Sequence, residues 1–286
     1  MENECKVGIV ILHYETVKDT MECIESINKN IKDNDVYIIV VDNGSKTGKL
    51  DALESNYANY DRMVFIRSDV NLGYAKGNNI GYKYAKEQLN CELIILANND
   101  LYFEDENFIK NLRKHYLTDK FDVAGPKIIS IMDGNNQNPV ARIFSSVRDV
   151  KKMKYKFYLL YMLTYLNMDT KIIRDNDYIH RDKLDKEDFQ LHGSCVILGN
   201  NYVKKFPGLC DKTFMYGEES ILKYVVDSKK LSMKYFDDVI VEHKEATTTK
   251  VVFGKGKNKR RFYYKWSANG CKVLEQLMEN KIKLFG

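Results

Sequence analysis

The sequence predicts an α/β protein with a mostly parallel central sheet flanked by helices, and two observations support this. Short runs of Val, Ile and Leu recur through the first hundred residues, at 7–12, 36–42, 63–67 and 92–97. Segments with apolar residues three or four positions apart separate these runs, which is the spacing of a helix with one buried side. Continuous apolar strands are typical of parallel sheets, because helices cover both faces.

The helices are expected in three places within this first part. Segment 20–31 (TMECIESINKNI) has four apolar residues at helical spacing, namely Met21, Ile24, Ile27 and Ile31. Segment 73–89 reads as a loop followed by a helix, and a further helix is expected over 106–117. Strands and helices therefore alternate, as βαβ units require.

The alternation loosens after residue 120. The expected elements are a strand at 122–130, a loop at 134–146, a basic amphipathic helix at 151–166, a strand entering a turn at 189–199, a helix at 216–230, one or two short strands at 233–243 and a basic helical tail from 257 to 280. No internal repeat and no linker-like composition is present. We expect one main domain over 1–245 and a basic, mainly helical extension over 246–286, packed on or beside it.

Composition narrows the class of protein. The chain has 286 residues, of which 44% are hydrophobic and 30% charged, as in ordinary globular domains. No apolar stretch is long enough to cross a bilayer. The six cysteines form no CxxC pair and no secretory leader precedes the first strand, so we expect a cytoplasmic location and free thiols.

The net charge of +5 is unevenly placed. No acidic residue occurs from 150 to 168, where four lysines run into an aromatic stretch, or from 246 to 274, where eight Lys and Arg occur. Such segments suit a ligand phosphate, nucleic acid or an anionic membrane surface. A solvated helix or a homodimer contact is the alternative. No nucleic-acid recognition motif accompanies them, so we expect no nucleic-acid partner.

The fourth apolar run ends abruptly in polar residues, as the stretch LIILANND (93–100) shows. Ligands of open α/β sheets bind outside the carboxyl ends of the strands, where Asn98, Asn99 and Asp100 would lie. Asp100 offers a hard oxygen ligand for Mg²⁺ or Mn²⁺, and Asn98 could support it or hold a ribose. The alternative for Asp100 is capping of the following turn.

Two further segments suit a nucleotide. Asp42 ends the second run and could accept hydrogen bonds from a base or ribose, or it could form a local Asx-turn. NLGYAKGNNIGY (71–82) spaces Gly73, Gly77 and Gly81 four apart. Glycines at a helix start let a ring or phosphate approach the backbone, although tight helix–sheet packing would use them equally.

Carboxylates and a histidine occur late in the chain. Glu218 and Glu219 stand at a predicted helix start, where a base could take a proton from an acceptor hydroxyl. Acids in a first helical turn are also favoured by the helix dipole. His243 follows a strand and is either a metal ligand or a hydrogen-bonded structural residue.

The order and spacing of these motifs resemble the family 2 glycosyltransferases, most closely their bacterial rhamnosyltransferase-like branch. The resemblance spans roughly residues 6–245, and NLGYAKGNNIG and LANND are its most specific parts. It implies a GT-A fold and an inverting transfer of a sugar from a UDP- or dTDP-sugar. The implied acceptor is a hydroxyl of a glycan or lipid-linked oligosaccharide in bacterial surface polysaccharide synthesis, such as capsule or O-antigen, at the inner face of the cell membrane.

The resemblance also implies roles for individual residues. Glu219 would be the general base, with Glu218 as a substitute. Asp100 and His243 would bind Mn²⁺ or Mg²⁺, and Gly193, Ser194 and Tyr216 would border the acceptor. The implied nucleotide-sugar-binding residues are His13, Asp42, Asn43, Asn71, Gly73, Lys76, Gly77, Asn79, Asn98, Asn99 and Asp100.

Three positions depart from the family pattern. Asn98 stands at the first position of the DxD metal motif, Glu219 stands where Asp is usual, and Ile221 replaces a later acid. A nucleotidyltransferase is an alternative, but LHYETVKD lacks the Gly-rich basic loop that usually follows its first strand. The other alternative is a non-catalytic relative that binds sugar nucleotides or glycans.

Overall fold

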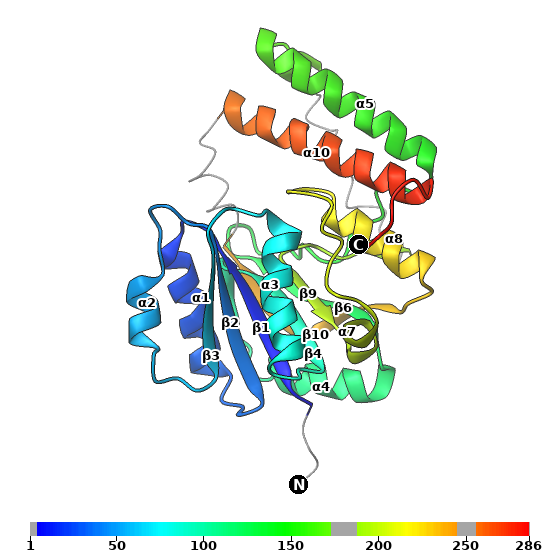
Figure 1. Ribbon diagram of the computed structural model, residues 1–286. Helices are drawn as coiled ribbons and strands as arrows, with labels where there is room; N and C mark the ends of the chain where they lie inside the picture. Colours follow the sequence, from blue (N-terminus) through cyan, green and yellow to red (C-terminus); the bar gives the residue numbers. More distant parts are fainter. Residues whose placement is uncertain (1–4, 173–187, 245–255, 286) are drawn as a thin grey trace.

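The computed structural model describes residues 5–172, 188–244 and 256–285. Its centre is a sheet of eight strands in the order β3-β2-β1-β4-β9-β6-β10-β5 (Figure 1). The strands are β1 (Val7–His13), β2 (Val36–Asn43), β3 (Met63–Ser68), β4 (Leu93–Asn98), β5 (Leu101–Tyr102), β6 (Val123–Ser130), β9 (Cys195–Leu198) and β10 (Met233–His243). A separate pair joins β7 (Val140–Ala141) and β8 (Phe189–Gln190).

The helices flank this sheet. They are α1 (Val17–Asn30), α2 (Asp51–Asn56), α3 (Tyr74–Glu87), α4 (Phe108–Asp119), α5 (Val147–Leu163), α6 (Asp169–Ile172), α7 (Asn200–Lys205), α8 (Glu218–Ser228) and α10 (Lys257–Met278), with a 3₁₀ turn, η1, at Thr164–Leu166. α1 and α4 share one hydrophobic core with the sheet, and α3, α7, α8 and α10 share the other. The prediction of a sheet covered on both faces is confirmed.

The parallel part of the sheet sets the position of the polar residues. β3, β2, β1 and β4 run parallel, and β1 pairs His13 with Asp42 on one side and Leu12 with Asn98 on the other. Neighbouring strands lie about 4.8 Å apart. Asp42 and Asn98 therefore lie at the same, carboxyl end of the parallel strands, separated by one strand.

The second half of the sheet differs from the expectation. β9 runs antiparallel between β4 and β6, and the short β5 pairs antiparallel with β10. The expected strand at 189–199 is divided into β8 and β9 by a turn at 192–194. Segment 233–243 forms one strand, β10, whose register shifts between Phe236 and Ile240.

α5 and α10 pack against each other beyond the carboxyl ends of the parallel strands, on the side away from the N-terminus (Figure 1). α10 lies between α5 and the rest of the molecule, and it also contacts α8. The expected boundary between residues 245 and 246 falls at the start of a segment outside the described residues, so the division into domains remains a prediction. Within the described ranges, no helix combines the length and apolarity needed to span a bilayer.

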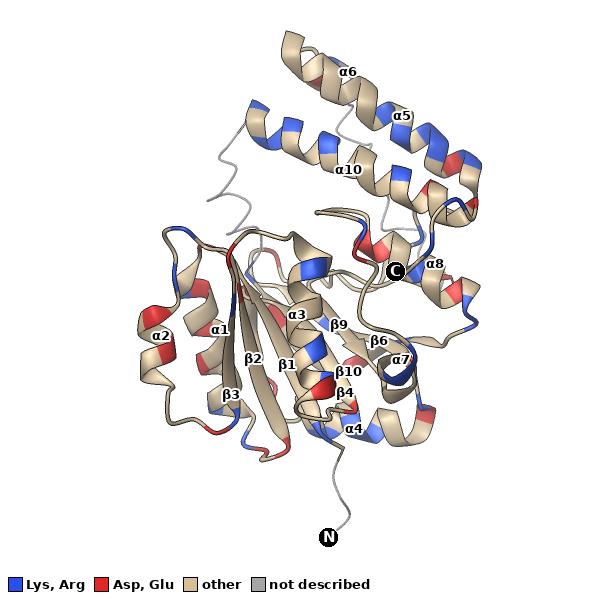
Figure 2. Cartoon of the chain, viewed as in Figure 1, with Lys and Arg blue, Asp and Glu red and all other residues tan. Residues whose placement is uncertain are grey.

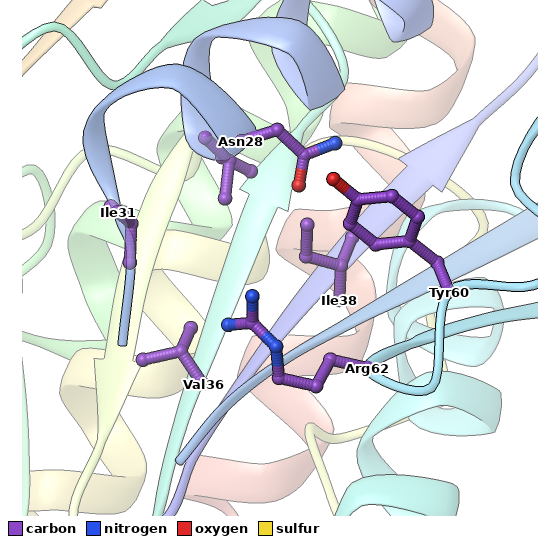
Figure 3. A pocket seen from close by; sticks show the side chains of 7 residues that line it. Asn28, Ile31, Val36, Ile38, Tyr60 and Arg62 are labelled. Atoms are coloured by element: carbon purple, nitrogen blue, oxygen red, sulfur yellow. The ribbon is translucent and has the colours of Figure 1, made fainter. Parts of the chain in front are cut away.

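A small pocket opens at the amino ends of β2 and β3 (Figure 3). Apolar residues of α1 and β2 line it together with Asn28, Tyr60 and Arg62. It lies at the opposite end of the strands from Asp42 and Asn98, so it takes no part in the site described next.

Candidate active site

Asp100 and His243 meet at the end of β4. The Oδ1 atom of Asp100 lies 3.3 Å from Nε2 of His243, and both side chains are buried. The main-chain N–H of Lys244 donates to the carbonyl of Asp100, which fixes the end of β10 beside the end of β4. The sequence placed these two residues 143 positions apart, and the fold brings them into contact.

The spacing of the pair suits two ligands of one cation and equally suits a His–Asp hydrogen bond. Gln137 Oε1 lies 2.7 Å from Nδ1 of His243, so Nδ1 is the donor and a neutral ring turns the lone pair of Nε2 toward Asp100. Asp100 Oδ1 is buried without a hydrogen-bond partner. Two facing acceptors require a proton or a cation between them. Ligands at right angles around Mg²⁺, each at about 2.1 Å, are about 3.0 Å apart, close to the distance observed.

The two residues fit a metal ion that takes most of its ligands from elsewhere. Among the described residues, no group of three or more His, Cys, Asp or Glu side chains could hold a metal. Mg²⁺ and Mn²⁺ are commonly bound through one or two protein ligands, with water and substrate phosphate oxygens completing the shell. Asp100 and His243 would therefore hold such an ion together with a diphosphate.

The turn at 192–194 connects this pair to the first turn of α8. The ring of His192 lies 5.8 Å from that of His243, edge to face. A Cβ atom placed on Gly193 would lie 2.8 Å from Oε1 of Glu219. The backbone N–H of Asn98 donates to the carbonyl of Ser194, which joins the turn to β4. The turn thus lies next to His243 through His192 and next to Glu219 through Gly193.

Glu218 and Glu219 begin α8 and both titrate above the ordinary range. Burial raises the pKa of Glu218 to about 8, and the neighbouring charge of Glu219 adds to the rise. Burial also raises the pKa of Glu219, while backbone N–H groups of Glu219 and Gly193 partly oppose it. The hydroxyl of Thr213 donates to Glu218, whereas Glu219 faces Gly193. A carboxylate with a raised pKa is a stronger base, which suits proton abstraction.

The loop before α8 is held by the C-terminal helix. Tyr216 has φ 67°, a left-handed conformation that costs a non-glycine residue about 1–2 kcal/mol. A Cβ on Gly270 of α10 would lie 2.4 Å from the carbonyl oxygen of Tyr216, so only glycine permits this approach. Rings of α10 also pack on the loop, since Phe214 lies 4.7 Å from Trp266 and Tyr216 lies 5.0 Å from Tyr263. α10 therefore supports the position of Glu219.

Asp42 and Asn43 shape the loops on the other side of the site. Asp42 Oδ1 accepts the N–H of Ser45, which is the Asx-type turn foreseen as the alternative to nucleotide contact. Asn43 accepts the N–H of Leu72 and donates to Asn71 and to the carbonyl of Gly73. These bonds fix the 71–73 segment against the end of β2.

Gly73 and Gly77 are required by close packing. Gly73 has φ +83°, and a Cβ there would lie 2.0 Å from the carbonyl oxygen of Phe214. A Cβ on Gly77 would meet Leu12 at 2.7 Å. These glycines therefore serve tight packing, as the alternative interpretation of the sequence expected. Lys76, which lies between them, is exposed at the start of α3.

Three of the predicted nucleotide-binding residues serve the protein itself. His13 is fully buried, and its ring nitrogens lie 2.6 Å from Thr20 Oγ1 and 2.6 Å from the carbonyl oxygen of Gly48. Asn79 donates to the carbonyl of Leu209 and accepts its N–H. Asn99 donates to the hydroxyls of Thr16 and Thr20. The contact of His13 with a nucleotide stays a prediction, and its ring has no exposed surface.

Sequence reasoning missed three residues. Glu15 accepts the backbone N–H groups of residues 46–48 and the hydroxyl of Thr47, and these bonds outweigh burial and lower its pKa to about 2. His192 accepts the N–H of Ser194 at Nδ1, which leaves the proton of a neutral ring on Nε2. Gln137 orients His243. Only His192, beside the predicted Gly193, lay next to a recognised motif.

Comparison with known proteins assigns the class. The model of the family described as Glycosyl transferase family 2 matches residues 8–181, more than half of the chain. The chain belongs to this family. It is 23% identical over 229 residues to a low-salt glycan biosynthesis hexosyltransferase, Agl10, of Haloferax volcanii, which covers 76% of this chain and 63% of the relative. It is 27% identical over 128 residues to the dTDP-rhamnosyl transferase RfbF of Shigella flexneri, covering 45% of this chain and 41% of the relative.

Solved structures confirm the GT-A fold. TarS of S. aureus superposes with a TM-score of 0.54 at 14% identity, covering 84% of this chain and 60% of that one. GalNAc-T7, solved with UDP, GalNAc and Mn²⁺, gives a TM-score of 0.60 at 14% identity, covering 86% and 45%. The chain spans less than two thirds of the length of these relatives and neighbours.

Proposed function

We propose that the protein is an inverting glycosyltransferase that transfers a sugar from a nucleotide-diphosphate sugar to an acceptor hydroxyl. The observation that carries the proposal is the convergence of Asp100, His243 and Glu219 around the 192–194 turn. The same turn therefore lies next to a pair suited to a cation and next to a half-buried carboxylate suited to a base. Family membership and the GT-A fold support the same activity.

Glu219 acts as the general base. It takes the proton of the acceptor hydroxyl as that oxygen attacks the anomeric carbon, and the bond from this carbon to the diphosphate oxygen breaks. Attack from the face opposite the leaving diphosphate inverts the anomeric carbon. General-base assistance of this kind contributes about 10²–10⁴-fold.

Asp100 and His243 would hold the divalent cation, Mn²⁺ or Mg²⁺. Bound there, it would supply positive charge to offset that of the departing diphosphate. With Asn98 at the first position of the metal motif, Asp100 supplies the only carboxylate of the pair, and Gln137 orients His243 through its Nδ1. Ile221 of α8, at the position of the later family acid, is buried in the hydrophobic core and contributes no charge.

The nucleotide is proposed to lie between the end of β2 and the start of α3. Asp42 and Lys76 are the side chains there proposed to contact it, with Asn43, Asn71, Gly73, Gly77, Asn79 and Asn99 fixing the backbone around it. Gly193, Ser194 and Tyr216 are proposed to border the acceptor. We further propose a UDP- or dTDP-sugar donor and a glycan or lipid-linked acceptor in bacterial surface polysaccharide synthesis, because relatives are named as a rhamnosyl transferase and a glycan biosynthesis hexosyltransferase.

A thermal-shift panel of UDP-, dTDP- and GDP-sugars, with and without Mn²⁺, tests the proposal. The correct donor with Mn²⁺ raises Tm, since a ligand at a hundredfold excess over Kd stabilises by about 2.7 kcal/mol. Slow hydrolysis of that donor then shows transfer to water. Stabilisation without any hydrolysis or transfer would favour the non-catalytic relative, and pyrophosphate release from a nucleoside triphosphate would favour the nucleotidyltransferase.

A further inference from the structure

α5 is apolar on two opposite sides. Val150 and Leu160 are buried, and the ring of Phe157 lies 6.4 Å from that of Tyr264 on α10. The opposite side carries Tyr155, Leu159 and Met162, which are 64%, 55% and 62% exposed. Their spacing of four and three residues places them on one outward stripe. A surface helix normally turns polar residues outward, so this side is built to be covered.

The exposed apolar residues concentrate on this helix pair. Of thirteen large hydrophobic side chains that are exposed in the described part of the chain, eight lie between Tyr155 and Met168 or on α10. η1 extends the stripe through Tyr165 and Leu166, 52% and 69% exposed. Tyr and Leu side chains at a surface of this kind are typical of segments that rest in a membrane interface.

The same pair is strongly basic. Segments 147–172 and 257–279 contain twelve Lys and Arg residues and four Asp and Glu residues, a net charge of +8, while the whole chain carries +5. Basic residues predominate on both helices (Figure 2). Three of the four acids bond to cations within the pair, since Asp169 meets Arg260, Glu275 meets Lys154 and Glu279 meets Lys151.

We propose that the outer stripe of α5 docks on an anionic lipid surface, with the lysines of α5 and α10 at its edges. Lys152 and Lys156 are exposed at one end of the stripe, and Lys265 is exposed on α10. Each Lys or Arg near an anionic bilayer strengthens binding, and inserted apolar side chains add to this. A second copy of the chain would set +8 against +8, and nucleic acid would leave the apolar stripe uncovered.

Docking would place the active site near the lipid surface. α5 and α10 lie beyond the edge of the sheet that carries Asp42 and Asn98 (Figure 1). α10 contacts α5 on one side and the loop preceding Glu218 on another. The docking proposal does not depend on the proposed activity, because lipid binding needs neither donor nor acceptor.

Co-sedimentation of the full chain with vesicles tests the proposal. Vesicles of phosphatidylcholine with about one third phosphatidylglycerol should bind the protein, and binding should weaken as salt screens the charges. Vesicles of phosphatidylcholine alone should bind at least about tenfold less. Equal binding to both vesicles, or no binding to either, would overturn the proposal.

Matched double variants locate the contact. L159S with M162S should weaken binding by about tenfold or more. L117S with M132S removes the same residue types at positions 74% and 68% exposed elsewhere and should leave binding unchanged. Equal losses in both variants would exclude the stripe. Sedimentation equilibrium without lipid tests whether a second copy covers the stripe. A dimer of the unaltered protein that becomes a monomer in the L159S, M162S double variant would show that it does, and would overturn the proposal.

Discussion

Two groups of residues at the carboxyl ends of the strands, called rims below, use their carboxylates in opposite ways. The β2 rim comprises residues 13–15, 42–48 and 71–79, and the β10 rim comprises 98–100, 192–194, 216–219 and 243. In the β2 rim the carboxylate of Glu15 accepts three backbone N–H groups, and Asn43 and Asn79 each both donate and accept. In the β10 rim Asp100 Oδ1 has no hydrogen-bond partner and burial raises the pKa of both glutamates.

The difference distinguishes side chains that stabilise loops from side chains suited to binding a cation or moving a proton. Satisfied polar groups stabilise loops, and their removal leaves buried partners unpaired. Uncompensated carboxylates cost stability and are typical of sites that bind a cation or move a proton. Substitutions of the hydrogen-bonded Glu15 and Asn79 in the β2 rim should therefore lower stability, whereas substitutions of Asp100, Glu219 and His243 in the β10 rim should lower activity and spare the fold.

The largest expected effect is that of Glu219→Gln. The amide cannot accept the acceptor proton, so kcat should fall by about 10²–10⁴-fold, while donor affinity stays within about twofold. Transfer rates and calorimetric donor binding measure the two quantities. Glu218→Gln is the matched control and should keep most of the turnover. A larger loss in Glu218→Gln would make Glu218 the base.

Asp100→Asn should follow in magnitude. Losing the only carboxylate of the pair should weaken Mn²⁺ binding in the presence of the nucleotide by about tenfold to a hundredfold, and a chelator should no longer change its activity. Titration calorimetry measures the affinity. His243→Gln should act in the same direction, whereas His115→Gln, at another His–Asp contact, should leave Mn²⁺ binding unaltered. An unchanged Mn²⁺ affinity in both β10-rim variants would remove the metal site from the proposal.

Asn79→Ala tests the β2 rim. The change leaves the N–H and C=O of Leu209 without their partners and should cost about 1–3 kcal/mol of unfolding free energy. Denaturant titration gives this value, and turnover well below Tm should change little. Asn56→Ala, at an exposed position, should be neutral. A variant of Asn79 that stays stable but binds the donor poorly would assign Asn79 to direct nucleotide contact.

The sequence predicts the β10 rim better than the β2 rim. Apolar runs placed β1 to β4, and the rule of strand carboxyl ends placed Asp42 and Asp100 on one edge. The partners of His13 and Asn79 lie 35 and 130 positions away, at Gly48 and Leu209, so no local pattern indicated that these side chains are already engaged.

Long-range packing explains two further features that the sequence did not predict, the direction of β9 and the role of Gly270. β9 enters the sheet antiparallel, which turns the 192–194 segment between His243 and Glu219. Gly270 gave no signal in the sequence, because its role is to let α10 approach Tyr216. The expected basic extension thus contributes directly to the support of the loop that precedes Glu219, the proposed base.

Two glutamates should show opposite dependences of stability on pH, and the first is Glu15 of the β2 rim. Its folded pKa of about 2 lies below the ordinary 4.5, so its stabilising contribution is present above pH 4.5 and is lost as pH falls toward 2. Glu15→Gln should lower Tm by a few degrees at pH 7, and this deficit should shrink toward pH 3. A deficit independent of pH would mean that the loop needs the side chain but not its charge.

Glu218 of the β10 rim should show the reverse sign. Its folded pKa of about 8 lies above 4.5, so its contribution is fully present below pH 4.5 and is lost as pH rises through 8. Glu218→Gln keeps an oxygen for the hydroxyl of Thr213 and removes the ionisable group. Its Tm relative to the unaltered protein should therefore rise between pH 5 and pH 9. A difference that stays flat would show that Glu218 ionises as freely as an exposed glutamate, and the contrast between the two rims would then rest on Asp100 and Glu219 alone.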